Sequence, residues 1–398
     1  MNVLNTPRSS AFWGTTCGPI FFTLVVYSSM HLHLIVGARP NFMKVAPIIA
    51  TIKKRVDVSF ALIHTWQHFD QQMSDAFFTD LWLPFPDYNL NIHGGLVPEQ
   101  IGKVMVAYTQ LLQEVTRPDY VVVVGDVNAT VACAITAKQL GIRVVHIESW
   151  LRSFDSTMPE EINRILTDSI SDLLFVTEES GVTNLANEGN ITWVELVGNV
   201  MIDCLIMHHD KIKQQSVVAE YCLTPKKYAV VTLHRPANVD TPDQLEKYLE
   251  FLVQVAQKQQ LILPLHPRTR NNIERFWLTK YLDTPQMTFV PPLGYFAFLH
   301  LVEHSSFVLT DSGGVQEETT YLGIPCLTMR ASTERPITCT IWSNTLVGDD
   351  FQRIHTLIDD ILAGSYKLWQ KPPLRDGATA ERIISSLLAD YQTARAWK

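Results

Sequence analysis

The chain has 398 residues, 46% of them hydrophobic, and a formal net charge of -8. This length predicts two or three domains, and the hydrophobic content is enough for sizeable cores, which excludes a disordered protein. The negative charge argues against nucleic acid as the main partner. An anionic substrate would therefore need a local cationic pocket.

Residues 1–29 differ in character from the rest of the chain. They include GPIFFTLVVYSS, an apolar stretch too short to span a membrane. Two interpretations remain open: a poor signal-peptide core, or a non-native extension ahead of a true start at Met30. We favour the extension, because MHLHLIVGARP already has the pattern of an opening strand.

The six cysteines form no CxxC pair. This pattern indicates free thiols in a reducing compartment and no zinc site. We therefore expect a cytoplasmic protein with neither a membrane nor a nucleic acid as its partner.

From Met30 onward, short β-branched runs alternate with helical stretches. The runs of the first half lie at 32–37, 58–65, 120–126, 142–148 and 172–177, and the helical stretches include 99–115 and 128–141. Continuous apolar strands alternating with helices predict a parallel sheet that is covered on both faces.

The same alternation then restarts. Its strands are predicted at 227–234, 261–266, 287–290 and 306–310, with a helix at 241–259. We therefore expect an α/β protein of two Rossmann-like domains, 30–197 and 198–377, which face each other across a cleft. The hinge is predicted near 194–203, and a last helix at 378–398 is expected to pack back onto the first domain.

The segment DSGGVQEE follows an apolar strand and opens a helix. Gly313 and Gly314 let backbone N–H groups approach an anion closely, and a helix N-terminus favours negative charge. Ser312 can donate its hydroxyl to a phosphate, and Glu318 is placed to accept ribose hydroxyls. Gly323 is predicted to end this helix. The competing interpretation is a plain helix start, since Asp-Ser-Gly-Gly is common turn chemistry.

A second glycine turn, GARPNFMK, follows the first strand. It carries Arg39 in the turn and Lys44 one helical turn later, and two such cations suit a diphosphate. A capping loop with solvated charges is the alternative. GxGxxG and GxxxxGK[ST] are both absent, so a dinucleotide or ATP site lacks its usual signature.

Acidic residues gather where strands end. Asp126 ends YVVVVGD, Glu148 ends IRVVHIE, and Glu160 and Glu161 follow Pro159 at a helix start. A buried strand rarely ends in an acid without a partner or a task, so these acids predict proton transfer at a sugar carbon. Structural roles compete: Glu160 or Glu161 can favour a helix N-terminus, and Asp126 can cap the following helix.

Two histidines hold equivalent places at the ends of neighbouring strands. His234 ends YAVVTLH, and His266 ends LILPLH. A histidine at such a place can donate to a phosphate or to a leaving oxygen. We expect one of the two to be a structural hydrogen-bonding group, and we favour His234 as the functional one.

From Met30 to about Gly348, the chain resembles the non-hydrolysing UDP-N-acetylglucosamine 2-epimerases. The resemblance rests, in this order, on GARPNFMKVAPI, QHFDQQMSDAFF, GDVNATVACA, HIESWLRSFDSTMPEEINR, VTLHRPANVD, LHPRTR, DSGGVQEE and TERPITCTIWSNTLVG. It implies two Rossmann-like domains of the GT-B type, no cofactor or metal, a homodimer and a role in cell-surface polysaccharide biosynthesis.

The resemblance also implies roles for individual positions. Asp126, Glu148 and Glu160 match the acid/base residues, and Arg164 and His234 match further catalytic positions. The positions matching UDP contacts are Arg39, Lys44, Ser312, Gly313, Gly314, Glu318 and Arg335, with Leu293 and Phe298 at the uracil. The implied mechanism eliminates UDP as the C2 proton leaves, which gives a 2-acetamidoglucal. The proton then returns on the other face and UDP adds back.

The chain departs from the family at five tryptophans, Trp66, Trp82, Trp150, Trp277 and Trp342, which stand where glycine is usual. Indole rings in tight turns beside Glu148 would block the pocket or break the backbone geometry. We hypothesise that these codons are UGA, read as glycine in the source organism. The competing interpretation is a diverged, inactive chain.

Several alternatives share part of the pattern. A hydrolysing 2-epimerase would release free N-acetylmannosamine and UDP. An epimerase of a modified UDP-sugar, such as a 2,3-diacetamido uronic acid, would differ in its sugar-side loops. A GT-B glycosyltransferase would need an acceptor and leave the three acids unexplained, and a non-catalytic UDP-sugar-binding protein is favoured only if the tryptophans are genuine.

Overall fold

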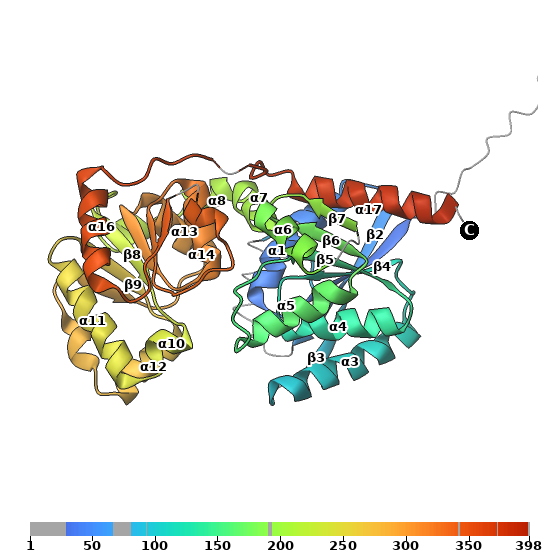
Figure 1. The fold of residues 1–398 in the computed structure, drawn as a ribbon, viewed down its shortest axis with the longest axis horizontal. Helices are drawn as coiled ribbons and strands as arrows, with labels where there is room; N and C mark the ends of the chain where they lie inside the picture. Colours follow the sequence, from blue (N-terminus) through green and yellow to red (C-terminus); the bar gives the residue numbers. More distant parts are fainter. Residues whose placement is uncertain are drawn as a thin grey trace, which may run out of the picture.

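The computed structural model describes residues 29–66, 81–92, 94–189, 193–340, 343–371 and 373–396, with only the backbone of Arg39 and Trp66. The predicted signal core or extension, the segment QHFDQQMSD and Trp342 therefore lie outside the described residues. The described chain forms two lobes, each built around one sheet (Figure 1). We call the lobe that contains β1–β7 the first lobe and the lobe that contains β8–β13 the second lobe.

Both sheets are wholly parallel and have the same strand order. The first runs β3-β2-β1-β4-β5-β6-β7, and the second β10-β9-β8-β11-β12-β13. The first sheet consists of β1 (Met30–Val36), β2 (Val58–Trp66), β3 (Tyr88–Ile92), β4 (Tyr120–Val124), β5 (Arg143–Ser149), β6 (Leu173–Val176) and β7 (Trp193–Leu196). The second consists of β8 (Tyr228–Thr232), β9 (Gln260–Pro264), β10 (Met287–Val290), β11 (Phe307–Thr310), β12 (Cys326–Thr328) and β13 (Asn344–Leu346).

Helices connect the strands and cover the sheets. In the first lobe these are α1 (Arg39–Ile52), α3 (Val97–Glu114), α4 (Asn128–Gln139), α5 (Pro159–Ile170), α6 (Glu179–Asn187) and α7 (Val200–Met207). The second lobe has α8 (His209–Lys213), α9 (Val217–Glu220), α10 (Pro236–Val239), α11 (Pro242–Ala256), α12 (Pro267–Arg275), η1 (Thr279–Asp283), α13 (Tyr295–His304), α14 (Gly313–Leu322), α15 (Ile337–Thr340) and α16 (Phe351–Ala363). None of the helices among the described residues is long and apolar enough to cross a membrane.

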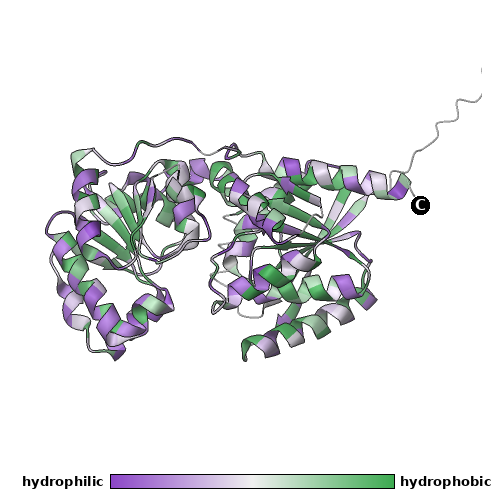
Figure 2. Ribbon diagram, in the orientation of Figure 1, coloured by the Kyte–Doolittle hydropathy of each residue, from purple (hydrophilic) through white to green (hydrophobic). Residues whose placement is uncertain are grey.

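The central strands are buried because helices cover both of their faces. All five residues of β4, YVVVV, are buried, as are all four of β11. Figure 2 shows these strands as hydrophobic bands inside more hydrophilic helices. The alternation of apolar runs with helices therefore predicted the parallel, doubly covered sheets correctly.

Four strands were not predicted, and all are short or lie towards a sheet edge. In β3, YNLNI, three of the five residues are exposed, and β7 begins with an exposed Trp193. β12 and β13 have three residues each. An edge strand needs little apolar surface, so its sequence resembles a loop.

After α16 the chain crosses back to the first lobe and ends in α17 (Thr379–Ala396), which contacts α1 and α7 (Figure 1). The crossing segment packs closely on the connection after β7. Gly198 there has a φ of 101°, and a Cβ at this position would collide with the carbonyl oxygen of Leu374. The chain thus passes twice between the lobes at one place, near the predicted hinge.

Candidate active site

Many of the predicted site residues follow strands at the two places where the strand order reverses. In the first sheet these are the carboxyl ends of β1 and β4, and in the second those of β8 and β11. Loops that leave a parallel sheet in opposite directions open a crevice between them, and ligands bind there in this class of fold.

The first lobe contributes Asp126 and Arg164, which form an ion pair. Helix α4 begins after Val127 without a side-chain cap, so Asp126 does not cap it and that alternative is wrong. Glu160 is half-buried on the first turn of α5. It lies four residues before Arg164, and residues four apart share one face of a helix.

Glu161, the neighbour of Glu160, has a structural role. Its buried carboxylate accepts hydrogen bonds at 3.0 Å from the backbone N–H groups of Ser153 and Phe154, and it also pairs with Arg164. Although burial opposes it, these bonds hold the pKa of Glu161 below its ordinary value. Glu161 therefore fixes the loop ahead of α5, which is a structural role other than the predicted effect on the helix N-terminus.

Glu148 connects the two lobes. It lies at an irregularity of β5 with a φ of 63°, and its carboxylate is buried between two cations. One carboxylate oxygen pairs with Lys44 of the first lobe, and the other lies 2.8 Å from Nη2 of Arg335 in the second lobe. Although burial acts to raise it, these cations hold the pKa of Glu148 below its ordinary value.

Strand register brings His234 to Asp311 in the second lobe. Thr232 pairs with Thr310 across β8 and β11, so the residues that follow them meet at the same edge. Buried Asp311 accepts hydrogen bonds at 2.8 Å from the backbone N–H groups of His234 and Arg235. His234 Nδ1 also lies 2.8 Å from the other carboxylate oxygen of Asp311. This arrangement places a proton on Nδ1 and leaves Nε2 for a ligand.

His266 caps a helix instead. Its Nδ1 accepts a hydrogen bond from the backbone N–H of Arg268 at the start of α12. The rings of His266 and His234 lie 5.4 Å apart. This arrangement agrees with the expectation that one histidine of the pair is structural.

A pocket of about 200 Å³ opens beside His234. Its lining includes four predicted residues, His234, Leu293, Phe298 and Ser312, together with apolar neighbours such as Val315. A small pocket with apolar walls and a few polar groups suits a planar heterocycle.

Helix α14 begins beside this pocket, with Ser312 as its N-cap, and ends at Gly323 with a φ of 70°, as predicted. A Cβ on Gly313 would lie 2.7 Å from an oxygen of Glu334, whereas Gly314 faces open space. Arg335 Nε lies 3.6 Å from that Cβ position and has no hydrogen-bond partner among the described residues. This buried guanidinium nitrogen therefore remains available beside the glycine turn.

Glu318 is buried one turn further along α14. Burial raises its pKa to about 7, although the hydroxyl of Tyr295 acts in the opposite direction. A carboxyl group with this pKa can change its protonation when hydroxyl donors reach it.

Other charged residues of the interface were not predicted. Glu317 pairs with Arg335 and with Arg375, and Glu334 pairs with Arg330. Glu317 lies inside a predicted motif, in which the expected ligand is its neighbour Glu318. Arg375 lies in no motif, and only its contacts reveal it.

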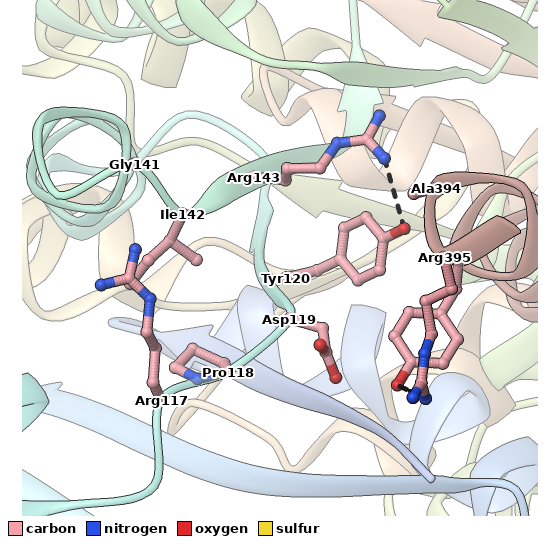
Figure 3. Close-up of a pocket in the computed structure, with 10 residues that line it drawn as sticks. Arg117, Pro118, Asp119, Tyr120, Gly141, Ile142, Arg143, Ala394 and Arg395 are labelled. Atoms are coloured by element: carbon pink, nitrogen blue, oxygen red, sulfur yellow. Dashed lines mark hydrogen bonds between the residues drawn. The ribbon is translucent and has the colours of Figure 1, made fainter. Parts of the chain in front are cut away.

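A larger pocket of about 580 Å³ lies elsewhere, at the amino ends of β4 and β5. Figure 3 shows Arg117, Arg143 and Arg395 around it, with a hydrogen bond from Arg143 to the hydroxyl of Tyr120. None of the predicted site residues lines it. Since ligands of parallel sheets bind at the carboxyl ends of the strands, size alone does not identify the site.

Comparisons with known proteins agree with the geometry. The sequence profile described as UDP-N-acetylglucosamine 2-epimerase matches residues 50–388. A UDP-N-acetylglucosamine 2-epimerase of Methanocaldococcus jannaschii is 38% identical over 365 residues, which cover 90% of this chain and 99% of that protein. A UDP-2,3-diacetamido-2,3-dideoxy-D-glucuronate 2-epimerase of Pseudomonas aeruginosa is 39% identical over 323 residues, 80% of this chain and 88% of that protein.

Solved structures show the same relationship. The M. jannaschii enzyme in complex with UDP-GlcNAc and UDP has a TM-score of 0.82 at 38% identity and covers 90% of this chain and 100% of its own. The UDP-GlcNAc 2-epimerase of Neisseria meningitidis bound to UDP-GlcNAc has a TM-score of 0.80 at 27% identity and covers the same shares. The predicted GT-B arrangement is thus confirmed, and the chain belongs to the UDP-N-acetylglucosamine 2-epimerase family of isomerases.

Proposed function

We propose that this protein interconverts UDP-GlcNAc and UDP-ManNAc without hydrolysis. The observation that carries the proposal is the contact of Arg335 in the second lobe with Glu148 in the first. It brings a candidate diphosphate ligand and a candidate proton-transfer group together at the interface of the lobes. The relatives that bind or act on UDP-GlcNAc supply the substrate class.

The nucleotide would bind to the second lobe. The uracil would bind in the pocket beside Leu293 and Phe298, and Glu318 would accept hydrogen bonds from the ribose hydroxyls. The diphosphate would lie at the start of α14, near Ser312 and the free Nε of Arg335. A helix N-terminus with two glycines and a guanidinium is well suited to an anion.

The sugar would then face the acids of the first lobe. One carboxylate takes the proton from C2 while the bond from C1 to the UDP oxygen breaks and its electron pair leaves with UDP. An acid on the other face returns a proton to C2, and UDP attacks C1 again. Glu148, Asp126 and Glu160 are the candidates for these transfers. When both of its ring nitrogens carry a proton, His234 is a candidate donor to the leaving oxygen through Nε2.

Lys44 and Arg335 are both paired with Glu148 in the structure described here. A bound diphosphate would share these cations, and Arg39 is proposed to join them from the first position of α1. With its counter-charges shared, Glu148 would hold a proton more readily. Substrate binding would thus make Glu148 a better acceptor for a proton from the sugar.

The test is incubation of the purified protein with UDP-GlcNAc in deuterated water, followed by NMR. We expect UDP-ManNAc to form and deuterium to enter at C2 of both sugars. Release of free N-acetylmannosamine with UDP would replace this proposal by the hydrolysing reaction. If the protein binds UDP but no deuterium enters at C2, its role is to bind UDP-sugars without catalysis.

A modified sugar is the second candidate, favoured by the 39% identity to the 2,3-diacetamido uronic acid epimerase. That substrate carries an additional acetamido group and a carboxylate on the sugar. The same exchange assay with both UDP-sugars distinguishes the two candidates by their relative kcat/KM.

We also propose, from the family resemblance, that the protein acts as a cytoplasmic homodimer that supplies cell-surface polysaccharide synthesis. Light scattering of the purified chain tests the assembly. A monomer at all concentrations would contradict it.

A further inference from the structure

Arg375 is a buried arginine in the segment that crosses back from the second lobe to the first. Only 1% of its side chain is exposed. Its Nη1 donates to the carbonyl oxygen of Thr177 in the first lobe at 2.7 Å. Its Nη2 donates to Glu317 on α14 of the second lobe at 3.2 Å. Burying a charged group costs free energy of desolvation, which only an opposite charge and hydrogen bonds can offset. The hydrogen bonds of Arg375 therefore direct attention to its partner carboxylate.

That partner, Glu317, is also in contact with the proposed UDP site. Its carboxylate lies 3.5 Å from Nη1 of Arg335, whose Nη2 lies 2.8 Å from Glu148. Charges therefore alternate from Arg375 through Glu317 and Arg335 to Glu148. Arg335 is the shared member, because it has a carboxylate on each side and a free Nε beside Gly313.

The two carboxylates compete for one guanidinium. Glu317 is 2% exposed, so water does little to screen the charge of its carboxylate. With Arg375 present, its Nη2 lies 3.4 Å from one carboxylate oxygen of Glu317 and 3.2 Å from the other, and balances much of that charge. Without Arg375, Arg335 is the remaining ion-pair partner of Glu317 among the described residues, and the low local polarity would strengthen that pair.

We propose that Arg375 is a positioning residue of the UDP site, which neutralises Glu317 and so keeps Arg335 directed at Glu148 and at the diphosphate. This inference rests on the proposed binding of UDP at α14. It assigns to the crossing segment a function beyond joining α16 to α17, since the segment supplies the counter-charge that leaves Arg335 available.

The experiment measures UDP affinity by isothermal titration calorimetry for Arg375→Gln, Glu317→Gln and the double variant. Arg375→Gln should weaken UDP binding by at least about tenfold, the order expected when one member of a buried charge network is lost. The double variant should recover to within about threefold of the original protein, since Glu317 then no longer competes with Glu148 and the diphosphate for Arg335. In Glu317→Gln, Arg375 still acts on the buried carboxyl group of Glu178, whose pKa is raised to about 7 by burial and lowered by Arg375.

Arg382→Gln is the matched control. Arg382 also joins the last part of the chain to the first lobe, through the carbonyl oxygen of Val197, and it pairs with Asp376. It has no contact with Glu317 or Arg335 among the described residues. Its replacement should leave UDP affinity unchanged, whereas a purely structural role of the crossing segment would make both arginine variants weaken UDP binding alike.

Two different failures can be distinguished. If the original protein does not bind UDP, the proposed function fails. If it binds UDP but the double variant is no tighter than Arg375→Gln, the positioning role is overturned. Should Arg375→Gln not fold, the comparison of Glu317→Gln with the double variant remains, and a tenfold difference in UDP affinity between them would contradict the inference.

Discussion

Trp277 offers a direct test of how the backbone constrains this sequence. It follows the C-cap Phe276 of α12 and has a φ of 61°. Its N–H donates to the carbonyl oxygen of Glu274, and that of Leu278 donates to the carbonyl oxygen of Ile273 at 2.9 Å. These two bonds form a Schellman motif, whose left-handed residue is usually glycine.

We expect Trp277→Gly to stabilise the protein. A side chain in the left-handed region costs about 1–2 kcal/mol, and the greater freedom of glycine in the unfolded chain offsets about 0.4–1 kcal/mol of this. The indole is 88% exposed, so little packing is lost. The middle values of these two ranges leave a net gain of about 0.8 kcal/mol, measured as a shift in the urea midpoint at constant m-value.

Two further variants control this prediction. Trp277→Ala keeps a Cβ at the same φ and should gain less than Trp277→Gly. Trp193→Gly, in the extended strand β7, should be destabilising because no left-handed residue is needed there. The reasoning is refuted if Trp277→Gly is no more stable than Trp277→Ala.

The same geometry supports the glycine hypothesis at other positions. Trp82 and Trp150 have φ values of 54° and 69°. The indole of Trp150 is buried against Leu174, Val176 and Leu185. Of the two expected effects, a blocked pocket or disturbed backbone geometry, the left-handed φ supports the second. The codons decide the matter: UGG at Trp66, Trp150 and Trp342 would end the hypothesis of a reassigned codon.

Three other predictions concern the site itself. Gly313→Ala should weaken UDP binding about tenfold in calorimetry, since its Cβ would lie 2.7 Å from Glu334; unchanged affinity would remove the glycine turn from the site. Asp311→Asn should lower kcat about a hundredfold with UDP affinity largely kept, because Asp311 orients His234, and a loss confined to UDP affinity would argue against that role. Glu318 has its pKa raised to about 7 by burial, so its contribution to stability is full below pH 4.5 and is lost as pH rises towards 7. Glu318→Gln should therefore reduce the fall in urea midpoint between pH 5 and 7.5, and an unchanged slope would show that Glu318 does not titrate in this range.

Local pattern was sufficient for much of the protein. Apolar runs of four or more residues identified the central strands, because such strands are covered on both faces. Glycines, acids and histidines that directly follow these runs identified the edge of each sheet where ligands bind, since all parallel strands end on the same side. Asp126, His234 and Gly313 were found in this way.

Contacts between residues far apart in the chain could not be inferred from local pattern. Glu148 is recognisable as an acid at a strand end, but its position between Lys44 and Arg335 depends on how the two lobes meet. Arg375 stands in a segment without any motif, and its burial against Glu317 follows from the second passage of the chain between the lobes. The charge state of such groups depends on neighbours and on exclusion of water, and only the folded chain provides both.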